Sequence, residues 1–194
     1  MTHSVRIDDR RRFRELWKEL VFARLLAAGA AGLAMRAIFE LGPFITSGAF
    51  LLIVYAFLFA APSWVAKRGW IVPVAVMLAS AVTIYLTYIL DTKILPGTDL
   101  FPMAVIAMAG AGLGVAEGQI EKSMATNYCG LLGGIASGAL ACRIIDPDDV
   151  HDGWWFLPAA FVMIHVGIGL SLALGRWMRD WPGRRAATPP AKPS

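Results

Sequence analysis

The sequence predicts an all-α membrane protein, a polytopic bundle of six transmembrane helices arranged as three hairpin repeats of the same orientation. Three observations lead to this fold class. Of the 194 residues, 57% are hydrophobic and only 16% are charged, whereas about a quarter of the residues of a soluble domain are charged. The apolar residues gather in runs of about 20, the length that crosses a bilayer. The segments between these runs are alternately basic and acidic.

The chain begins with a basic arm, residues 1–19, that is too highly charged for a cleavable signal peptide. Phe13, Leu16 and Trp17 recur in it at helical spacing. One interpretation therefore places the arm along the membrane surface, with its cations on anionic lipid head groups. The simpler interpretation is a charge cluster that only orients the first span. Either way, we expect the arm in the cytoplasm.

Six apolar runs follow the arm, and each is expected to be a helix because backbone groups in lipid must satisfy their own hydrogen bonds. The basic connections contain Lys67, Arg68 and Lys122, and they alternate with acidic ones. The basic side is the cytoplasm of a bacterial inner membrane by the positive-inside rule. An even number of spans leaves both termini there. The predicted spans are Leu20–Phe39, Pro43–Ala61, Trp70–Leu90, Phe101–Gln119, Ala125–Ile145 and Trp154–Gly175.

The turns repeat along this predicted transmembrane domain, residues 20–178. Pro43, Pro96 and Pro147 mark the outer turns at intervals of about 52 residues, a period that indicates an internal repeat. The hairpins are then about 20–68, 70–122 and 124–176, and copies are related by an axis along the membrane normal. Chance spacing in a bundle with short loops is the alternative. Residues 179–194 are rich in proline, alanine and basic residues and are expected to form a disordered cytoplasmic tail.

Glycine recurs every fourth residue on two consecutive predicted spans. Small residues at this spacing let helix backbones approach closely in a bilayer. We interpret the two stripes as a close-packed contact between the second and third hairpins, and leucine at either Gly114 or Gly134 is expected to force the helices apart. The stripes consist of Gly110, Gly114 and Gly118 on one helix and Gly130, Gly134 and Gly138 on the other.

The hairpins share a pattern: a first helix of small and aliphatic residues, a Pro/Gly turn and a second helix that ends in a basic residue. Residues 24–43 (RLLAAGAAGLAMRAIFELGP) with 44–68 have it, as do residues 131–141 (LLGGIASGALA) with 154–176. This pattern resembles the two-helix unit of HdeD-type acid-resistance membrane proteins over most of the chain. The middle hairpin departs from it in its longer polar turn, 91–99. The resemblance implies an inner-membrane protein associated with acid or other stress tolerance, and it brings no catalytic residues.

His165 is the sharpest candidate for function, because ionisable residues at membrane depth are costly and often functional. It lies about midway along the last predicted span. An unperturbed imidazole titrates near neutral pH, and Glu117 or Arg143 on neighbouring helices are possible partners in a proton relay. The alternative is a neutral histidine that donates one hydrogen bond across a helix interface to Ser, Thr or a backbone carbonyl. A single histidine makes no pathway, which favours this alternative.

Four other charged residues within or near the predicted spans are candidates for a role. Glu117 either faces the bundle interior or, more simply, is a solvated carboxylate at the interface. Arg36 and Glu40 are four residues apart, so they share a helix face and are expected to pair. Arg143 lies near the outer end of its span and is expected to extend toward the acidic loop that follows.

Several classes of site and function are not expected. The acidic outer loop, residues 146–152, lacks the glycine and the terminal glutamate of an EF-hand, and its simpler role is to stay hydrated, so no metal site is predicted. Cys129 and Cys142 lie too far apart on one helix to bond. No phosphate-binding loop, nucleophile elbow or zinc motif occurs, so neither an enzyme nor a cofactor is expected. Membrane topology explains the positions of the basic residues, so no nucleic-acid partner is expected.

Three functions remain open from the sequence. The first is a stress-associated membrane protein without catalytic activity. The second is a small transporter or channel, or a membrane subunit of one, with a path near Glu117 and His165; it predicts a polar cavity at membrane depth. The third is a structural subunit that forms a homo-oligomer or binds a membrane partner through its small-residue faces. It predicts that the glycine stripes face another chain.

Overall fold

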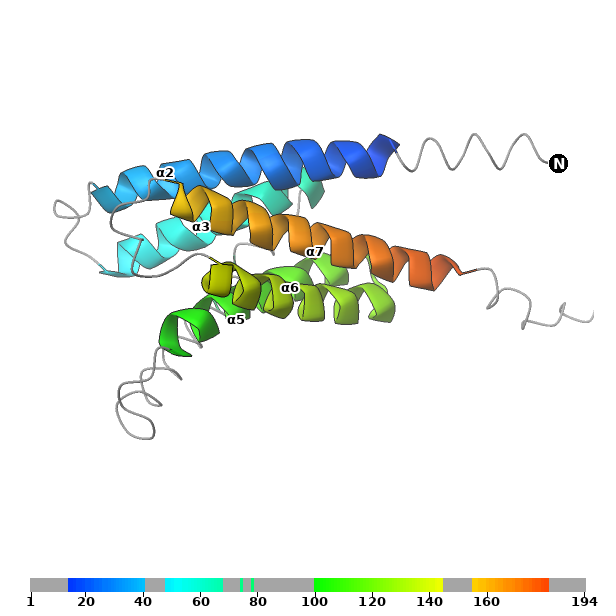
Figure 1. Cartoon of the computed structure of the whole chain (residues 1–194). Helices are drawn as coiled ribbons and strands as arrows, with labels where there is room; N and C mark the ends of the chain where they lie inside the picture. The colour runs from blue at the N-terminus through cyan, green and yellow to red at the C-terminus, as the bar shows by residue number, and fades with distance from the viewer. Residues whose placement is uncertain are drawn as a thin grey trace, which may run out of the picture.

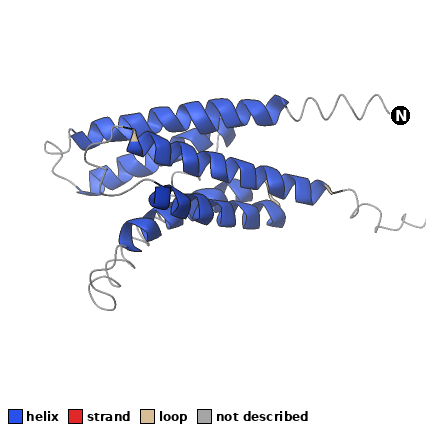
Figure 2. Cartoon of the chain, viewed as in Figure 1, coloured by secondary structure: helices blue, strands red, loops and turns tan. Residues whose placement is uncertain are grey.

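The computed structural model describes residues 14–40, 48–67, 74, 78, 100–144 and 155–181, and these residues are helical apart from short turns. Figure 2 shows helices and turns, with no strand in the described part of the chain. The all-α prediction is therefore confirmed. The helices are η1 (Glu19–Ala27), α2 (Ala28–Glu40), α3 (Gly48–Lys67), α5 (Leu100–Ile120), α6 (Met124–Ile144) and α7 (Phe156–Asp180).

Two helices are long and apolar enough to cross a membrane: Arg14–Ile38 and Phe156–Asp180, with mean hydropathies of 1.5 and 2.0. The chain thus has the elements of a membrane-associated protein. Several predictions concern segments outside the described residues: most of the basic arm, the span 70–90, the three outer proline turns, the acidic loop 146–152 and the tail beyond Trp181.

Two helices extend beyond the predicted spans. α3 runs to Lys67 and α7 to Asp180, whereas the apolar runs end near Ala61 and Gly175. A helix keeps closing backbone hydrogen bonds after its side chains become polar, so the end of an apolar run does not end the helix. Exposed Trp64 lies in the added part of α3. These additional turns also carry Ser63 and Arg176, which are important below.

The first helix, residues 14–40, is continuous but changes its winding. Residues 14–18 are α-helical, η1 is a π-helix of nine residues, and α2 continues the same rod as an α-helix. π-Helices form i→i+5 hydrogen bonds and are rare, and they occur frequently at functional sites. Within η1, Ala23 and Arg24 are buried. The unusual winding therefore coincides with a buried arginine.

α7 lies between the first helix on one side and the α5–α6 pair on the other (Figure 1). Its buried residues Ile164, Ile168 and Leu172 form part of one apolar core with Leu113 of α5 and Phe59 of α3. The start of the first helix and the end of α7 lie at the same end of the molecule in Figure 1. The short turn between α5 and α6 is closed by a bond from the Lys122 amide to the Gln119 carbonyl, 3.0 Å.

The two glycine stripes face each other across the α5–α6 contact, and all six glycines are buried. A Cβ on Gly114 would meet the backbone of Gly130, and one on Gly110 would meet the backbone of Gly134. At the end of the contact far from the α5–α6 turn, a Cβ on Gly138 would lie 2.7 Å from the Cα atom of Ala107. Backbone approaches backbone here because no side chains intervene. These glycine faces are therefore filled from within one chain.

Candidate functional site

The site begins with a buried ion pair that joins the first helix to α5. Arg24 Nη1 donates to Glu117 Oε1 at 2.6 Å, and Nη2 donates to Oε2, so the pair is bidentate. Both side chains have no exposed surface. Charge-assisted bidentate pairs are among the strongest hydrogen-bonded contacts in proteins. Such a pair is needed here, because an unpaired charge in this position would carry a large desolvation cost.

The winding of η1 helps to place Arg24. Arg24 Nη2 also donates to Glu19 Oε1 at 3.1 Å, a contact between residues i and i+5. In an α-helix these residues would lie about 140° apart around the axis, at 100° per residue. The wider π-helical turn brings both side chains to one face. α7 leaves room for the arginine at Gly169, where a Cβ would lie 3.3 Å from Arg24 Nε.

Ser63 of α3 connects this ion pair to His165 of α7. Its hydroxyl donates to Glu117 Oε1 at 2.5 Å, and its Oγ lies 3.5 Å from His165 Nδ1. The other ring nitrogen, Nε2, lies 2.8 Å from the backbone oxygen of Phe59. Ser63 and His165 are both fully buried. Residues that are distant in sequence on four helices thus form one continuous polar chain.

The contact with Phe59 fixes the protonation of one ring nitrogen. A backbone carbonyl can only accept, so Nε2 of His165 carries a proton and donates it to Phe59. In a neutral imidazole the other nitrogen, Nδ1, is then an acceptor. The Phe59 ring lies 5.4 Å from the imidazole centroid and packs edge-on against Phe161 at 5.1 Å. The imidazole is therefore packed against the Phe59 ring, with Nδ1 facing Ser63.

A second group of charges continues the chain toward the ends of the helices. Arg176 of α7 donates to Glu121 Oε1 through Nε and Nη2, at 2.9 and 2.6 Å, and its Nη1 lies 3.5 Å from Glu19 Oε2. These side chains are partly exposed, at 24% for Arg176, 10% for Glu121 and 19% for Glu19. Glu19 thus links the exposed group to buried Arg24.

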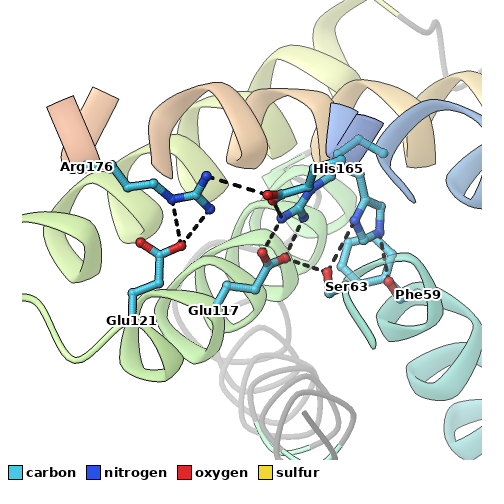
Figure 3. Close-up of polar contacts among 8 residues, drawn as sticks. Phe59, Ser63, Glu117, Glu121, His165 and Arg176 are labelled. Carbon is cyan, nitrogen blue, oxygen red and sulfur yellow. Dashed lines mark hydrogen bonds and ion pairs between the residues drawn. The ribbon is translucent and has the colours of Figure 1, made fainter. Parts of the chain in front are cut away.

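Together these contacts form what we call the polar network: Glu19, Arg24, Ser63, Glu117, Glu121, His165 and Arg176. Figure 3 shows its contacts, from Arg176 at one end to the Phe59 carbonyl at the other. From Arg176 to His165 is eleven residues, or about 16 Å along α7 at 1.5 Å per residue. The network is partly exposed at the helix ends and becomes fully buried at Glu117 and His165.

The structure brings together two of the residues singled out from the sequence. Glu117 is buried and paired, so the simpler interpretation of a solvated carboxylate is wrong. His165 donates to a backbone carbonyl across a helix interface, as the favoured alternative expected, and also lies beside Ser63. Its predicted relay partner Glu117 is reached through that serine. Arg143, by contrast, is exposed at the far end of α6.

Arg36 and Glu40 take no part in the polar network. Arg36 Nε donates to Glu40 Oε1 at 3.1 Å on one face of α2, the geometry expected from a four-residue spacing. Glu40 is 64% exposed, and Arg36 lies twelve residues beyond Arg24, or about 18 Å along the helix. This pair is a surface contact of small energetic weight. It also offers a matched comparison for the buried pair.

Sequence reasoning missed five members of the site: Glu19, Arg24, Ser63, Glu121 and Arg176. Arg24 carried a usable signal, since an arginine within an apolar span needs a partner. Glu117, the one acidic residue within the predicted span 101–119, could have been considered as that partner. The contact between Glu19 and Arg24 gave no signal, because an α-helix would not place these two residues on one face. Ser63 lay beyond the predicted end of its span.

The chemistry of the polar network is that of protons and charges. Among the described residues, no group of three His, Cys, Asp or Glu side chains is placed to hold a metal ion. The network contains three carboxylates and two guanidinium groups, joined to an imidazole by a hydroxyl. Carboxylates, hydroxyls and imidazoles donate and accept protons in turn.

Comparisons with protein-family models, with curated proteins and with solved structures find no match for this chain.

Proposed function

We propose that this chain is an integral, multi-pass protein of the bacterial inner membrane that contributes to acid or other stress tolerance without catalysing a reaction. In this proposal its six spans form three hairpins, both termini are cytoplasmic, and the polar network takes up protons from the cytoplasm. The observation that carries the proposal is the fully buried run Arg24–Glu117–Ser63–His165. Ionisable groups inside a membrane bundle are costly, so they are functional candidates by default.

The position of the network supports the cytoplasmic direction of uptake. Its exposed end lies near the ends of helices that carry the exposed residues Trp17, Lys18, Lys122, Trp177 and Arg179. Indole rings at the membrane interface and cations on the cytoplasmic side are the two signals of topology. Glu121 and Arg176 then lie near the cytoplasmic surface. His165 lies deeper, about halfway through a hydrocarbon core of ~30 Å.

Survival during acid challenge tests this proposal. The strain that lacks the gene should lose viability faster than its parent, and a copy of the natural gene should restore survival. A copy with both Arg24→Gln and Glu117→Gln should fail to restore it, because the network loses its fully buried carboxylate together with the guanidinium that pairs with it. A copy with Arg36→Gln and Glu40→Gln should restore it fully. Membrane levels of each variant are matched by immunoblot.

Equal survival of the deletion strain and its parent, at every acid exposure, would contradict the proposal. Full restoration by the Arg24→Gln, Glu117→Gln copy would also contradict it, because the polar network would then be dispensable.

The second candidate function is proton-linked transport. It is favoured by the continuity of the polar network from the helix ends to His165. In this proposal the network extends about halfway across the membrane. A transporter would move protons across the bilayer of a liposome that contains the protein, whereas a protein that only senses acid would take up protons without net flux. The third function, assembly through the glycine stripes, is less favoured. The stripes of α5 and α6 fill each other, so they do not offer a surface for another chain.

A further inference from the structure

We infer that Ser63 relays a proton between Glu117 and His165 by reversing the direction of its hydroxyl. This inference rests on the proposed uptake of protons by the polar network, and it assigns a role to a residue that no sequence pattern singled out. Ser63 is the one described side chain in hydrogen-bond range of both groups.

The Ser63 hydroxyl has one proton and two possible acceptors for it. Glu117 Oε1 lies 2.5 Å from Ser63 Oγ, whereas His165 Nδ1 lies 3.5 Å away. In the resting state the hydroxyl therefore donates to the carboxylate, and Nδ1 has only a long contact. The imidazole cannot use its other nitrogen, because Nε2 is engaged with the Phe59 carbonyl. Any proton exchanged with Glu117 must reach His165 at Nδ1 through Ser63.

A proton that arrives at Glu117 reverses this arrangement. The carboxylate gains an O–H bond and donates to Ser63 Oγ, and the serine hydroxyl turns to donate to Nδ1. Transfer along the same line completes the relay: the Glu117 O–H bond breaks as a new O–H bond forms at Ser63, and the original Ser63 O–H bond breaks as an N–H bond forms at Nδ1. Serine is unchanged, glutamate is again a carboxylate, and the imidazole is a cation. The long Ser63–His165 contact is expected to shorten during the step, as hydrogen bonds in proton-transfer sites do.

The charges around Glu117 come from few directions. Arg24 contacts it from the first helix, and Glu19 lies behind Arg24. Arg176 and Glu121 lie one turn further toward the exposed end. α6 carries no charged residue except Arg143 at its far end, and α3 carries only its last residue, Lys67. The partly exposed carboxylates Glu19 and Glu121 accept hydrogen bonds from the two guanidinium groups at this end of the network. Ser63 is the one described side chain that can carry a proton from Glu117 toward the bundle centre.

The test uses ¹⁵N-histidine magnetic resonance of the full chain in lipid bilayers. A background with His3→Asn and His151→Asn leaves His165 as the single histidine. In this background the Nδ1 resonance should shift as the pH is lowered, because Nδ1 changes from a weakly bonded acceptor to a strongly bonded or protonated nitrogen. Ser63→Ala should abolish that shift, and Ser63→Thr should retain it because threonine keeps the hydroxyl. Ser137→Ala is the matched control, since it removes a buried hydroxyl that donates to the Gly133 carbonyl at 2.6 Å, and it should retain the shift.

An Nδ1 shift in Ser63→Ala equal to that of the parent would overturn the relay, as would loss of the shift in Ser63→Thr when both proteins are folded. Survival in acid is scored separately. If survival depends on Glu117 while Ser63→Ala titrates normally, the relay is wrong and the proposed function stands. If the deletion strain survives as well as its parent while the Nδ1 shift depends on Ser63, the relay stands and the proposed function is wrong.

Discussion

Replacing Glu117 with alanine should destabilise the folded protein by about 3–5 kcal/mol, because the buried Arg24 charge loses its bidentate partner and keeps only the contact with Glu19. Arg24 has no exposed surface through which it could reach water without rearrangement of the first helix. Equilibrium unfolding of the purified protein in mixed micelles measures this loss. Replacing both partners, Arg24→Met with Glu117→Met, should recover most of the stability, because apolar side chains of similar volume replace a buried pair at little cost.

The matched control is Glu40→Ala. Its partner Arg36 is 22% exposed, and Glu40 itself is 64% exposed, so the expected change is about 0–1 kcal/mol. A Glu117→Ala protein that is as stable as the Glu40→Ala protein would contradict the buried ion pair. So would a double variant that is less stable than Glu117→Ala alone, because the loss could not then come from an unpaired charge.

Alanine at Gly114 should separate α5 from α6. The added Cβ would lie far inside van der Waals contact with the Gly130 carbonyl, and backbone atoms cannot turn aside as a flexible side chain can. Overpacking of this kind typically costs about 1–3 kcal/mol, and leucine at the same position should cost more. Thermal unfolding in detergent measures the effect, and Gly134→Ala should behave similarly because its Cβ would meet the Gly110 backbone.

Gly29→Ala is the control for the helix-propensity change. A Cβ on Gly29 would lie 3.7 Å from Val162 Cγ2, an ordinary contact, although Gly29 too lies within a helix that packs on α7. Alanine is favoured over glycine in helices by about 1 kcal/mol, so this variant should be as stable as the natural protein or more so. Equal melting temperatures for Gly29→Ala and Gly114→Ala would mean that α5 and α6 do not approach at their backbones.

Much of the helical architecture could be predicted from the sequence because it depends on apolar length. The apolar runs 101–119 and 125–145 correspond closely to α5 and α6, and the four-residue glycine spacing placed the small faces of both helices. The expected contact between these two faces is present, because the stripes on α5 and α6 fill each other. Lys122, in the turn that joins the two helices, has a positive φ of 50°, which periodicity does not anticipate.

The site was predicted in part, for reasons that lie in its residues. Glu117 and His165 stood out because each is ionisable within an apolar run. Their connection depends on Ser63, which lies past the end of an apolar run. A serine there attracts no notice in the sequence, and its role depends on its position on α3. Arg24 depends on a π-helical section, which an analysis at 100° per residue does not anticipate. The resemblance to HdeD-type proteins and the three-hairpin arrangement stay predictions.

Infrared difference spectroscopy of the lipid-embedded protein tests most directly the claim that Glu117 takes up a proton. Lowering the pH should protonate several carboxylates of the natural protein, and one of the resulting carboxylic-acid C=O stretching bands should belong to Glu117. That band should be missing from the Arg24→Gln, Glu117→Gln double variant and should persist in the Arg36→Gln, Glu40→Gln double variant. A full set of bands that remains in the first double variant, or a natural protein that shows no band unique to Glu117 down to the pH at which it unfolds, would contradict the account.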